Sequence, residues 1–289
     1  MNLCSYVVQK TATFAISNNI IMSLRKSFFV SILLLSLSLA VSLPSLAWWG
    51  VTGHRVVGEI AQSYLSAKAR KAIREILGDE TLAMAANWGD FIKSDSNYGY
   101  LSPWHYNNLK AGMTASEVQA RLLSDTVALF SKTNFIIEQL KNKELSQDKK
   151  LLYLRLLIHF IGDMHQPLHV GGRPEDLGGN RVKVLWFNEP TNLHSVWDDK
   201  LPEFQKLSYT EWAAAINHTT KKQRQEWQKQ PMTDWCWESY QLAQSIYAEI
   251  KEPDQKLGYG YNFDHIDQVN QRLLKGGVRL AGILNEIFK

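Results

Sequence analysis

Two histidine and aspartate pairs occur at the same spacing in this sequence. His159 and Asp163 are four residues apart in "LRLLIHFIGDMHQPLH", and His194 and Asp198 repeat that spacing in "NLHSVWDDKLP". On a helix, side chains four residues apart project from one face, one turn apart. Imidazole nitrogen and carboxylate oxygen together form a ligand set that suits zinc. Each pair is therefore a candidate part of a metal site.

The surroundings of these pairs favour metal binding over a simpler alternative. A single buried histidine paired with an aspartate can be a satisfied core group. Three histidines and two aspartates within 40 residues, counting His169, are costly to bury unless a cation compensates them. Upstream, His54, Asp90 and His105 are further candidates, although each alone could serve a structural role at a helix start, a cap or a loop.

The elements that must position these residues are mostly helices. The first two expected helices cover 54–65 and 66–77, the second capped by Ser66 and ended by Gly78. Further amphipathic runs cover about 114–142, 147–164, 208–228, 233–251 and 266–288. Pro167 ends the helix of His159, directly before His169.

One segment only has the composition of a strand. It is "NRVKVLWF", Asn180–Phe187, entered through "LGGN" and left through "NEPTN". The sequence therefore predicts a single, mainly α domain with a small β element near 180–187. Trp212 and Trp235 are expected in its core, and His165, His218 and His265 are expected to be surface or structural residues.

The first 47 residues have the layout of a secretory signal. Arg25 and Lys26 precede the apolar run "FFVSILLLSLSLAV", and "SLA" at Ser45–Ala47 offers small residues for cleavage. Residues 1–21 precede a second methionine, Met22, and are expected to be an upstream extension. An uncleaved membrane anchor is the alternative, because the run is nearly long enough to span a bilayer. We expect a secreted or periplasmic domain over 48–289, with no membrane span after cleavage.

Charge and cysteine content limit the function of this domain. Residues 1–47 hold three basic residues and no acid, so cleavage lowers the basic count from 32 to 29 against 28 acids. A near-neutral protein lacks a global field for polyanions, so a nucleic-acid partner must be held by a local site. Cleavage also leaves Cys236 as the only cysteine, so a large core or metal must stabilise the domain.

Taken in order, the motifs of this chain resemble those of the zinc-dependent single-strand nuclease and 3′-nucleotidase family. The matching segments are "WGVTGH", "WGD", "WHY", "HFIGDMHQPLH", "NLHSVWD" and the closing "GGVRLAGILNEI". The resemblance covers essentially all of 49–289. This family shares its fold with bacterial zinc phospholipase C, so the resemblance implies a single helical domain of that type.

The resemblance implies three zinc ions and their ligands. The first ion would be held by Asp90, His105, His159 and Asp163, and the second by His169, His194 and Asp198. The third would be held by His54, by Asp163 as a bridging ligand, and by the free amine and carbonyl of Trp49. The cleavage site after Ala47 leaves Trp48 first instead, so trimming must expose Trp49 or Trp48 must take the amine role.

The resemblance also implies how these residues act. Zinc would lower the pKa of a bound water to supply a hydroxide, with Asp90 and Asp163 holding the ions. Lys93 matches a residue that neutralises charge on the phosphoryl group, the alternative being a solvated surface lysine. Tyr106 matches a base-stacking aromatic, or could be core, and Asn108 matches a position that hydrogen-bonds the base edge.

The expected activity is hydrolysis of single-stranded DNA and RNA and of 3′-nucleotides, without a stable protein partner. A phospholipase C activity is the second hypothesis, although such enzymes resemble this chain less, having a glutamate where Asp198 stands. A non-catalytic exported zinc-binding protein is the third hypothesis.

Overall fold

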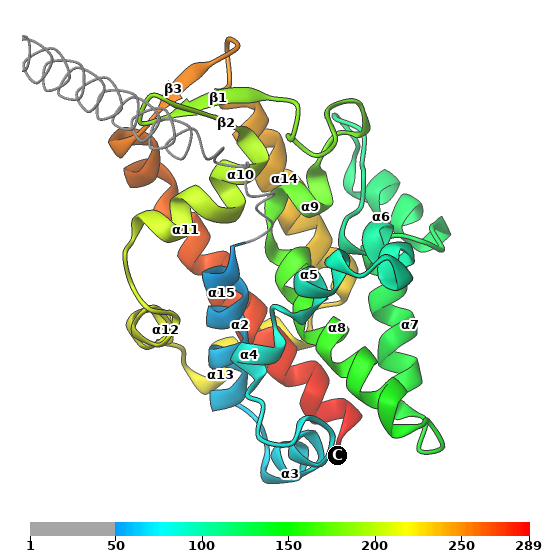
Figure 1. Ribbon diagram of the computed structural model, residues 1–289. Helices are drawn as coiled ribbons and strands as arrows, with labels where there is room; N and C mark the ends of the chain where they lie inside the picture. Colours follow the sequence, from blue (N-terminus) through cyan, green and yellow to red (C-terminus); the bar gives the residue numbers. More distant parts are fainter. Residues whose placement is uncertain (1–49) are drawn as a thin grey trace, which may run out of the picture. The chain divides into compact units, whose positions relative to one another are not determined.

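The computed structural model describes residues 50–289, so the predicted leader, Trp48 and Trp49 lie outside the described residues. This part of the chain is mainly helical, which confirms the predicted fold class (Figure 1). The helices up to the sheet are α2 (Val51–Ser63), α3 (Ala67–Leu77), α4 (Leu82–Ala85), α5 (Trp88–Phe91), α6 (Ala115–Ser124), α7 (Leu129–Lys141), α8 (Gln147–His165) and α9 (Pro167–Gly171). Those after it are α10 (Leu193–Ser195), α11 (Leu201–Phe204), α12 (Tyr209–Ile216), α13 (Lys221–Lys229), α14 (Met232–Glu249) and α15 (Tyr259–Ile287).

Short turns of tighter or wider helix join these elements. The 3₁₀ segments are η1 (Ile92–Ser94), η2 (Ser96–His105) and η3 (Pro174–Asp176), and η4 (Val196–Lys200) is a π-helical turn. Three of the predicted site residues lie in or beside such irregular turns. Asp90 comes shortly before η1, His105 is the last residue of η2, and Asp198 lies within η4.

Helix α8 is the buried centre of the fold. Every residue from Leu156 to His165 is buried, because α7, α14, α15 and α2 all pack against this helix (Figure 1). A helix that is apolar on all sides belongs in the core of a protein. His159 and Asp163 are therefore carried into the interior by a helix that has no solvent face along its second half.

The β element is larger than the sequence pattern predicts. The predicted strand shortens to β1 (Lys183–Trp186), which pairs antiparallel with β2 (Glu189–Asn192) and parallel with β3 (Gln255–Leu257). "NEPTN" is therefore mostly a strand and not only an exit. Phe187 and Asn188 both have positive φ, as the tight two-residue hairpin turn requires.

Two long predicted helices are each broken in the structure. The run at 114–142 is interrupted after Ser124, where the carboxylate of Asp125 accepts the N–H groups of Val127 and Ala128 at 2.8 and 2.7 Å. The run at 208–228 is interrupted after Ile216, and Thr220 starts α13 with a capping box to Gln223. Local hydrogen bonds by short polar side chains thus outweigh the helical periodicity.

Other predictions about the core are confirmed. Trp212 and Trp235 are 2% and 3% exposed, and Pro167 follows the end of α8, although it also begins the short helix α9. His165 and His265 are buried, whereas His218 is exposed. Within residues 50–289, we find no helix that is both long and apolar enough to cross a bilayer.

A buried charge cluster fastens the end of α8 to the last two long helices. Glu238 on α14 accepts hydrogen bonds from Arg272 at 2.6 Å and from Arg279 at 2.9 Å, both on α15. Arg272 also donates to the carbonyl of His165, and the Ser239 hydroxyl donates to the carbonyl of Met164. These carbonyls belong to the last turn of α8, where no intrahelical donor remains for them.

The cluster predicts a specific dependence of stability on pH. Burial alone would raise the pKa of Glu238, but Arg279 and Arg272 outweigh it and lower the pKa to about 2. A carboxyl whose pKa is lowered on folding stabilises the native state above its ordinary pKa, and that contribution is lost as pH falls toward the lowered value. Glu238→Gln should therefore cost about 3–5 kcal/mol at neutral pH, because it leaves two buried cations uncompensated.

Denaturant unfolding of both proteins from pH 7 to pH 3.5 tests this. The difference in the free energy of unfolding between wild type and Glu238→Gln should become smaller by about 1 kcal/mol on acidification. The matched control is Glu138→Gln, which removes an exposed ion pair with Lys141 and should cost less than about 1 kcal/mol. A difference that does not change with pH would contradict a stabilising role for the Glu238 charge.

Candidate metal centre

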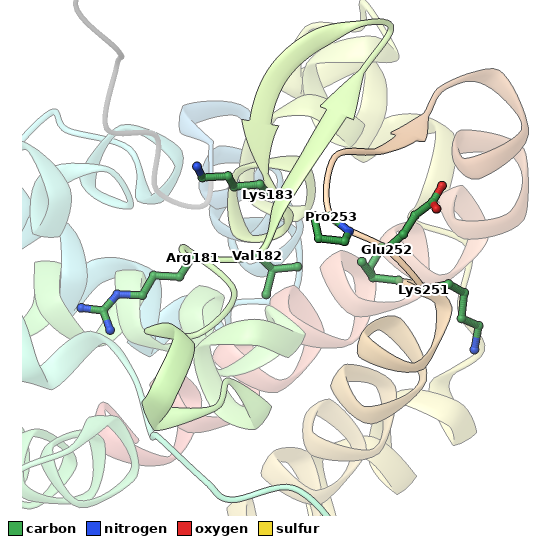
Figure 2. A pocket seen from close by; sticks show the side chains of 7 residues that line it. Arg181, Val182, Lys183, Lys251, Glu252 and Pro253 are labelled. Atoms are coloured by element: carbon green, nitrogen blue, oxygen red, sulfur yellow. The ribbon is translucent and has the colours of Figure 1, made fainter.

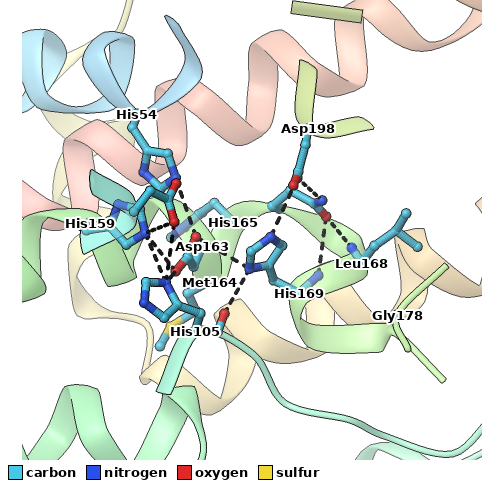
Figure 3. A network of polar contacts seen from close by, with 12 residues as sticks. His54, His105, His159, Asp163, Met164, His165, Leu168, His169, Gly178 and Asp198 are labelled. Carbon is cyan, nitrogen blue, oxygen red and sulfur yellow. Dashed lines mark hydrogen bonds and ion pairs between the residues drawn. The ribbon is translucent and has the colours of Figure 1, made fainter. Parts of the chain in front are cut away.

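The structure brings the predicted histidines and aspartates into one buried cluster (Figure 3). Helix α8 supplies His159 and Asp163, and the first turn of α2 supplies His54. The remaining members come from five short elements: α5 with Asp90, η2 with His105, α9 with His169, α10 with His194 and η4 with Asp198. The long helices thus form the base, and the turns close over it.

Asp163 lies at the middle of the cluster. Its Oδ2 is 3.0 Å from Nδ1 of His105 and 3.3 Å from Nε2 of His159. Its Oδ1 is 3.4 Å from Nε2 of His54 and 3.4 Å from Nδ1 of His169. One carboxylate therefore contacts four imidazoles that come from four different elements.

Around His159 the ring nitrogens themselves converge. Nε2 of His159 is 3.1 Å from Nδ1 of His105 and 3.4 Å from Oδ1 of Asp90. Nδ1 of His159 lies 2.7 Å from the carbonyl oxygen of Ala86, which can only accept, so Nδ1 carries the proton. Neutral His159 consequently presents a lone pair on Nε2 to a second nitrogen and two carboxylates, which is how ligands of a common cation are arranged.

The second half of the cluster is built in the same way. Nε2 of His194 is 2.9 Å from Oδ2 of Asp198, and Nε2 of His169 is 3.5 Å from Oδ1 of Asp198. The two imidazoles stack with centroids 5.0 Å apart. Nδ1 of His169 donates to the carbonyl of His105 at 2.8 Å, and Nδ1 of His194 donates to that of Gly178 at 2.7 Å. Backbone carbonyls in this position orient imidazoles that bind metal through the other nitrogen.

The carboxylates of the cluster raise the pKa values of two neighbouring histidines and so favour positive charge at this place. Burial lowers the pKa of His159, but Asp163 and Asp90 outweigh it and raise it to about 10. In the same way Asp163 and Asp198 overcome burial and raise the pKa of His169 to about 9. In the other direction, burial and the neighbouring His159 charge lower the pKa of His54. Protons or metal ions must therefore neutralise the three carboxylates.

Three groups of donor atoms in the described residues have the spacing of metal ligands. Each group has its atoms within 4.8 Å of one another; they are His105, His159 and Asp163; His169, His194 and Asp198; and His54, Asp90 and His159. Tetrahedral zinc with bonds of roughly 2.0–2.2 Å separates its ligand atoms by about 3.3–3.6 Å. Within the groups, nitrogen and carboxylate oxygen are 2.9–3.5 Å apart; the separations of 3.3–3.5 Å match that geometry, and the shorter ones are hydrogen-bond distances.

The third group differs in part from the expected ligand set. His54 lies close to Asp163 as expected, but it also stacks on His159, with centroids 4.0 Å apart and an angle of 13°. Trp49, the other expected ligand, lies outside the described residues. The N–H of Gly50, its neighbour, donates to the carbonyl of Asp198 at 2.5 Å, so the described chain begins beside the cluster.

Glycines make the stacked imidazoles possible. A Cβ on Gly162 would lie 2.5 Å from Nδ1 of His54, and a Cβ on Gly89 would lie 2.6 Å from Cδ2 of His159. Real side chains do not approach so closely, so both rings rest directly on glycine backbone. "HFIGD" and "WGD" therefore contain glycine for a steric reason as well as carrying their acids.

The other predicted residues lie at the edge of the cluster. Nζ of Lys93 contacts Oδ1 of Asp90 at 2.7 Å, and the lysine side chain is 16% exposed, so it is not a solvated surface lysine. Tyr106 and Asn108 are half-buried on the extended segment that follows His105. Between them the N–H of Asn107 donates to the carbonyl of His169 at 2.7 Å, which ties this segment to α9.

Two polar residues of the site were not predicted from the sequence. The amide of Gln166 donates to Oδ1 of Asp198, while its oxygen accepts the N–H groups of Leu168 and His169. It thus caps α9 and orients Asp198 together. The side chain of Asn107 accepts the N–H of Phe130 at 3.4 Å. Their closeness in the sequence to predicted ligands, Gln166 to His169 and Asn107 to His105, in apolar surroundings, is the signal that could have indicated them.

A cavity elsewhere in the described chain has a different character from the histidine and aspartate cluster (Figure 2). It has a volume of about 350 Å³ and is lined by Arg181, Val182, Lys183, Ile250, Lys251, Glu252 and Pro253. Figure 2 shows Arg181 and Lys183 extending to one side and Lys251 to the other, and Glu252 adds the opposite charge. Its cations do not converge on one point, and none of the predicted site residues lines it.

Comparisons with known proteins agree with this geometry. Residues 49–289 match the S1/P1 Nuclease family. Endonuclease 3 from Arabidopsis thaliana is 32% identical over 268 residues, covering 83% of this chain and 89% of that protein. Nuclease P1 from Penicillium citrinum is 28% identical over 268 residues, covering 83% and 97%. Nuclease S1 from Aspergillus oryzae is 32% identical over 164 residues, covering 54% and 55%.

The close approach of Gly162 to His54 yields a testable substitution. Gly162→Ala should displace the His54 ring and cost about 1–3 kcal/mol of stability through overpacking, despite the better helix propensity of alanine. Gly260→Ala, on the first turn of α15 with nothing near its Cβ position, is the matched control and should be neutral or slightly stabilising. Chemical denaturation of the two variants measures both effects. Equal stabilities would contradict the packing described for His54.

Proposed function

The chain belongs to the S1/P1 nuclease family, and from this premise we propose that it is a secreted, zinc-dependent hydrolase of phosphate esters. Its proposed substrates are single-stranded DNA, single-stranded RNA and 3′-nucleotides. The observation that carries the proposal is the cluster around Asp163, in which imidazole nitrogens converge on buried carboxylates. Nitrogen and carboxylate oxygen together favour zinc over magnesium or calcium, which prefer oxygen alone.

The proposed ligand assignment follows the three groups of donor atoms. Asp90, His105, His159 and Asp163 would hold the first ion, and His169, His194 and Asp198 the second. His54 and Asp163 would hold the third ion with the amine and carbonyl of Trp49. The hydrogen bond from Gly50 to Asp198 supports this last assignment, because it fixes the residue after Trp49 beside the cluster. Export with removal of residues 1–48 would provide the free amine.

Bound zinc would polarise the phosphoryl group and lower the pKa of a water molecule toward about 7. The protein's own residues would do the rest. Asp90 and Asp163 would hold the positive charges in a largely buried site, where electrostatic stabilisation is strong. Lys93 lies beside Asp90 and would neutralise charge that develops on the phosphoryl oxygens.

Tyr106 and Asn108 are the proposed contacts to the base. Stacking on an aromatic ring is available only to a base that has left its duplex neighbours. Asn108 offers both a donor and an acceptor to the base edge. Because Asn107 between them is held by α9, the base contacts and the metal ligand His105 form one rigid segment.

Metal analysis with an activity assay tests the proposal. The mature protein should contain three zinc ions, one for each group of donor atoms, and a chelator should abolish hydrolysis of single-stranded nucleic acid. His169→Ala should remove one ion and lower activity at least about 100-fold, since loss of outer-shell contacts alone costs 10–100-fold. The control is His218→Ala, an exposed histidine outside the cluster. Hydrolysis of a choline phospholipid without nuclease activity, or bound zinc without any turnover, would contradict the proposal.

The terminal amine can be tested separately. A protein that begins at Trp49 should bind all three ions, whereas one with a short uncleaved extension before Trp49 should lack the third ion and most activity. The reason is that an amide nitrogen has no lone pair to donate to a metal. Mass spectrometry of the exported protein would identify Trp48 or Trp49 as the first residue. An extended protein with three ions and full activity would rule out the amine ligand.

A further inference from the structure

The buried cluster approaches the surface at Asp90. The side chain of Asp90 is 22% exposed, whereas those of His159 and Asp163 are 0% and 1% exposed. Lys93, which contacts Asp90, is 16% exposed. A phosphate that reaches the cluster through the described residues must therefore come close to α5 and η1.

Aromatic side chains line the chain on both sides of this opening. Trp88, Tyr98, Tyr100 and Trp104, which we call the aromatic row, contact one another in series. Their successive ring centroids are 5.7, 6.4 and 5.6 Å apart. The row starts two residues before Asp90 and ends directly before His105. Both of its ends are thus attached to proposed ligands of the first ion.

Part of the surface of the aromatic row is exposed to solvent. Tyr100 is 53% exposed, and the other three members are only half-buried. Among the residues from Ser96 to Trp104 only Leu101 is fully buried, while Tyr98 and Trp104 pack against the core with part of their surface. Aromatic surface that stays in water next to a binding site is a mark of ligand contact.

Positive charge accompanies the aromatic rings. Nζ of Lys132 on α7 lies 4.8 Å from the ring centroid of Trp104 and 5.8 Å from that of Phe135, which is 41% exposed. The guanidinium of Arg155 lies 5.5 Å from the ring of Trp88, but it is also paired with Glu80 at 2.7 Å. Lys132 is therefore the cation of this surface that can best meet a phosphate.

We propose that the aromatic row with Lys132 binds the single strand next to the phosphate that is cut. This inference rests on the proposed function and extends it from the reacting nucleotide to its neighbours. Aromatic faces that accept successive bases, together with cations that follow the backbone, are how single strands are bound without sequence preference. Duplex DNA cannot use the row, because its base faces are already stacked.

Other exposed surfaces fit this role less well. The cavity in Figure 2 has diverging cations and none of the aromatic row. Phe263 on α15 is 80% exposed, but it is on a helix that carries none of the proposed ligands. The aromatic row alone is continuous in sequence with both Asp90 and His105.

The experiment compares a long and a short substrate on the same proteins. Tyr100→Ala should raise KM for a single-stranded oligonucleotide of about 20 residues roughly tenfold, from the loss of one stacking platform. Hydrolysis of a 3′-mononucleotide, which is too short to reach the row, should change less than twofold, and zinc content should not change. Tyr100→Phe should behave as wild type. Lys132→Ala should raise KM for the oligonucleotide and leave hydrolysis of the 3′-mononucleotide unchanged.

Two control variants distinguish the aromatic row from other exposed surfaces of the protein. Phe263→Ala removes a more exposed aromatic ring and Lys183→Ala removes a cation of the cavity in Figure 2, and neither should alter KM. The proposal is overturned if Tyr100→Ala leaves the oligonucleotide unaffected, if it impairs both substrates equally, or if Lys183→Ala has the larger effect. If wild type hydrolyses neither substrate, the proposed function fails. Oligonucleotide binding by fluorescence anisotropy to wild type and Tyr100→Ala then still tests the row.

Discussion

The position of one carboxylate, that of Asp163, constrains most of this structure. Four imidazoles lie within 3.0–3.4 Å of its two oxygens, and they come from α2, η2, α8 and α9. A carboxylate buried to 1% exposure is tolerated only where it is fully compensated. The elements that supply these imidazoles must therefore do more than pack: α2, η2 and α9 must each deliver a histidine to a fixed point beside α8. Gly162 and Gly89 show how tightly that requirement limits the neighbouring positions, since no larger residue leaves room for the rings.

The same constraint links metal binding to folding. In the absence of metal, the acids raise the pKa values of His159 and His169, so protons supply the compensating charge. Zinc would have to displace those protons, and its binding would favour the native state because the unfolded chain does not assemble the site. Under the proposed function, a domain whose described cysteine, Cys236, is buried and free would gain from bound metal the stabilisation that many exported domains take from disulfides. The charge cluster around Glu238 also stabilises α8, the helix that carries Asp163, because Arg272 and Ser239 donate to its last carbonyls.

Sequence reasoning succeeded where the chemistry follows the helical period. The pairs His159 with Asp163 and His194 with Asp198 are adjacent in the structure because a spacing of four places them on one face. Sequence reasoning failed where local hydrogen bonds, or pairing with a distant segment, determine the structure. Asp125 breaks a periodic helix through its own backbone contacts, and β3 pairs with β1 across about 70 residues, which no local pattern reports. Gln166 was missed because a glutamine has no preferred chemistry until its neighbours are known. The proposed ligand role of Trp49 depends on where the leader would be removed, and Trp49 lies outside the described residues.

The depth of the cluster also bears on which substrates can react. Six of the eight described ligand candidates are at most 1% exposed and His194 only 5%, so access depends on the region of Asp90 and Lys93. A phosphate in a regular duplex is flanked by paired and stacked neighbours, whereas a strand with free bases can turn a nucleotide toward Tyr106. Tyr106 is adjacent to His105, and the N–H of the next residue, Asn107, is hydrogen-bonded to the carbonyl of His169 on α9, so the proposed base contact lies close to the proposed metal ligands. Under the proposed function, preference for unpaired strands would then follow from this short separation and from burial, whereas the proposed contact of Asn108 with the base edge would affect only which base is preferred.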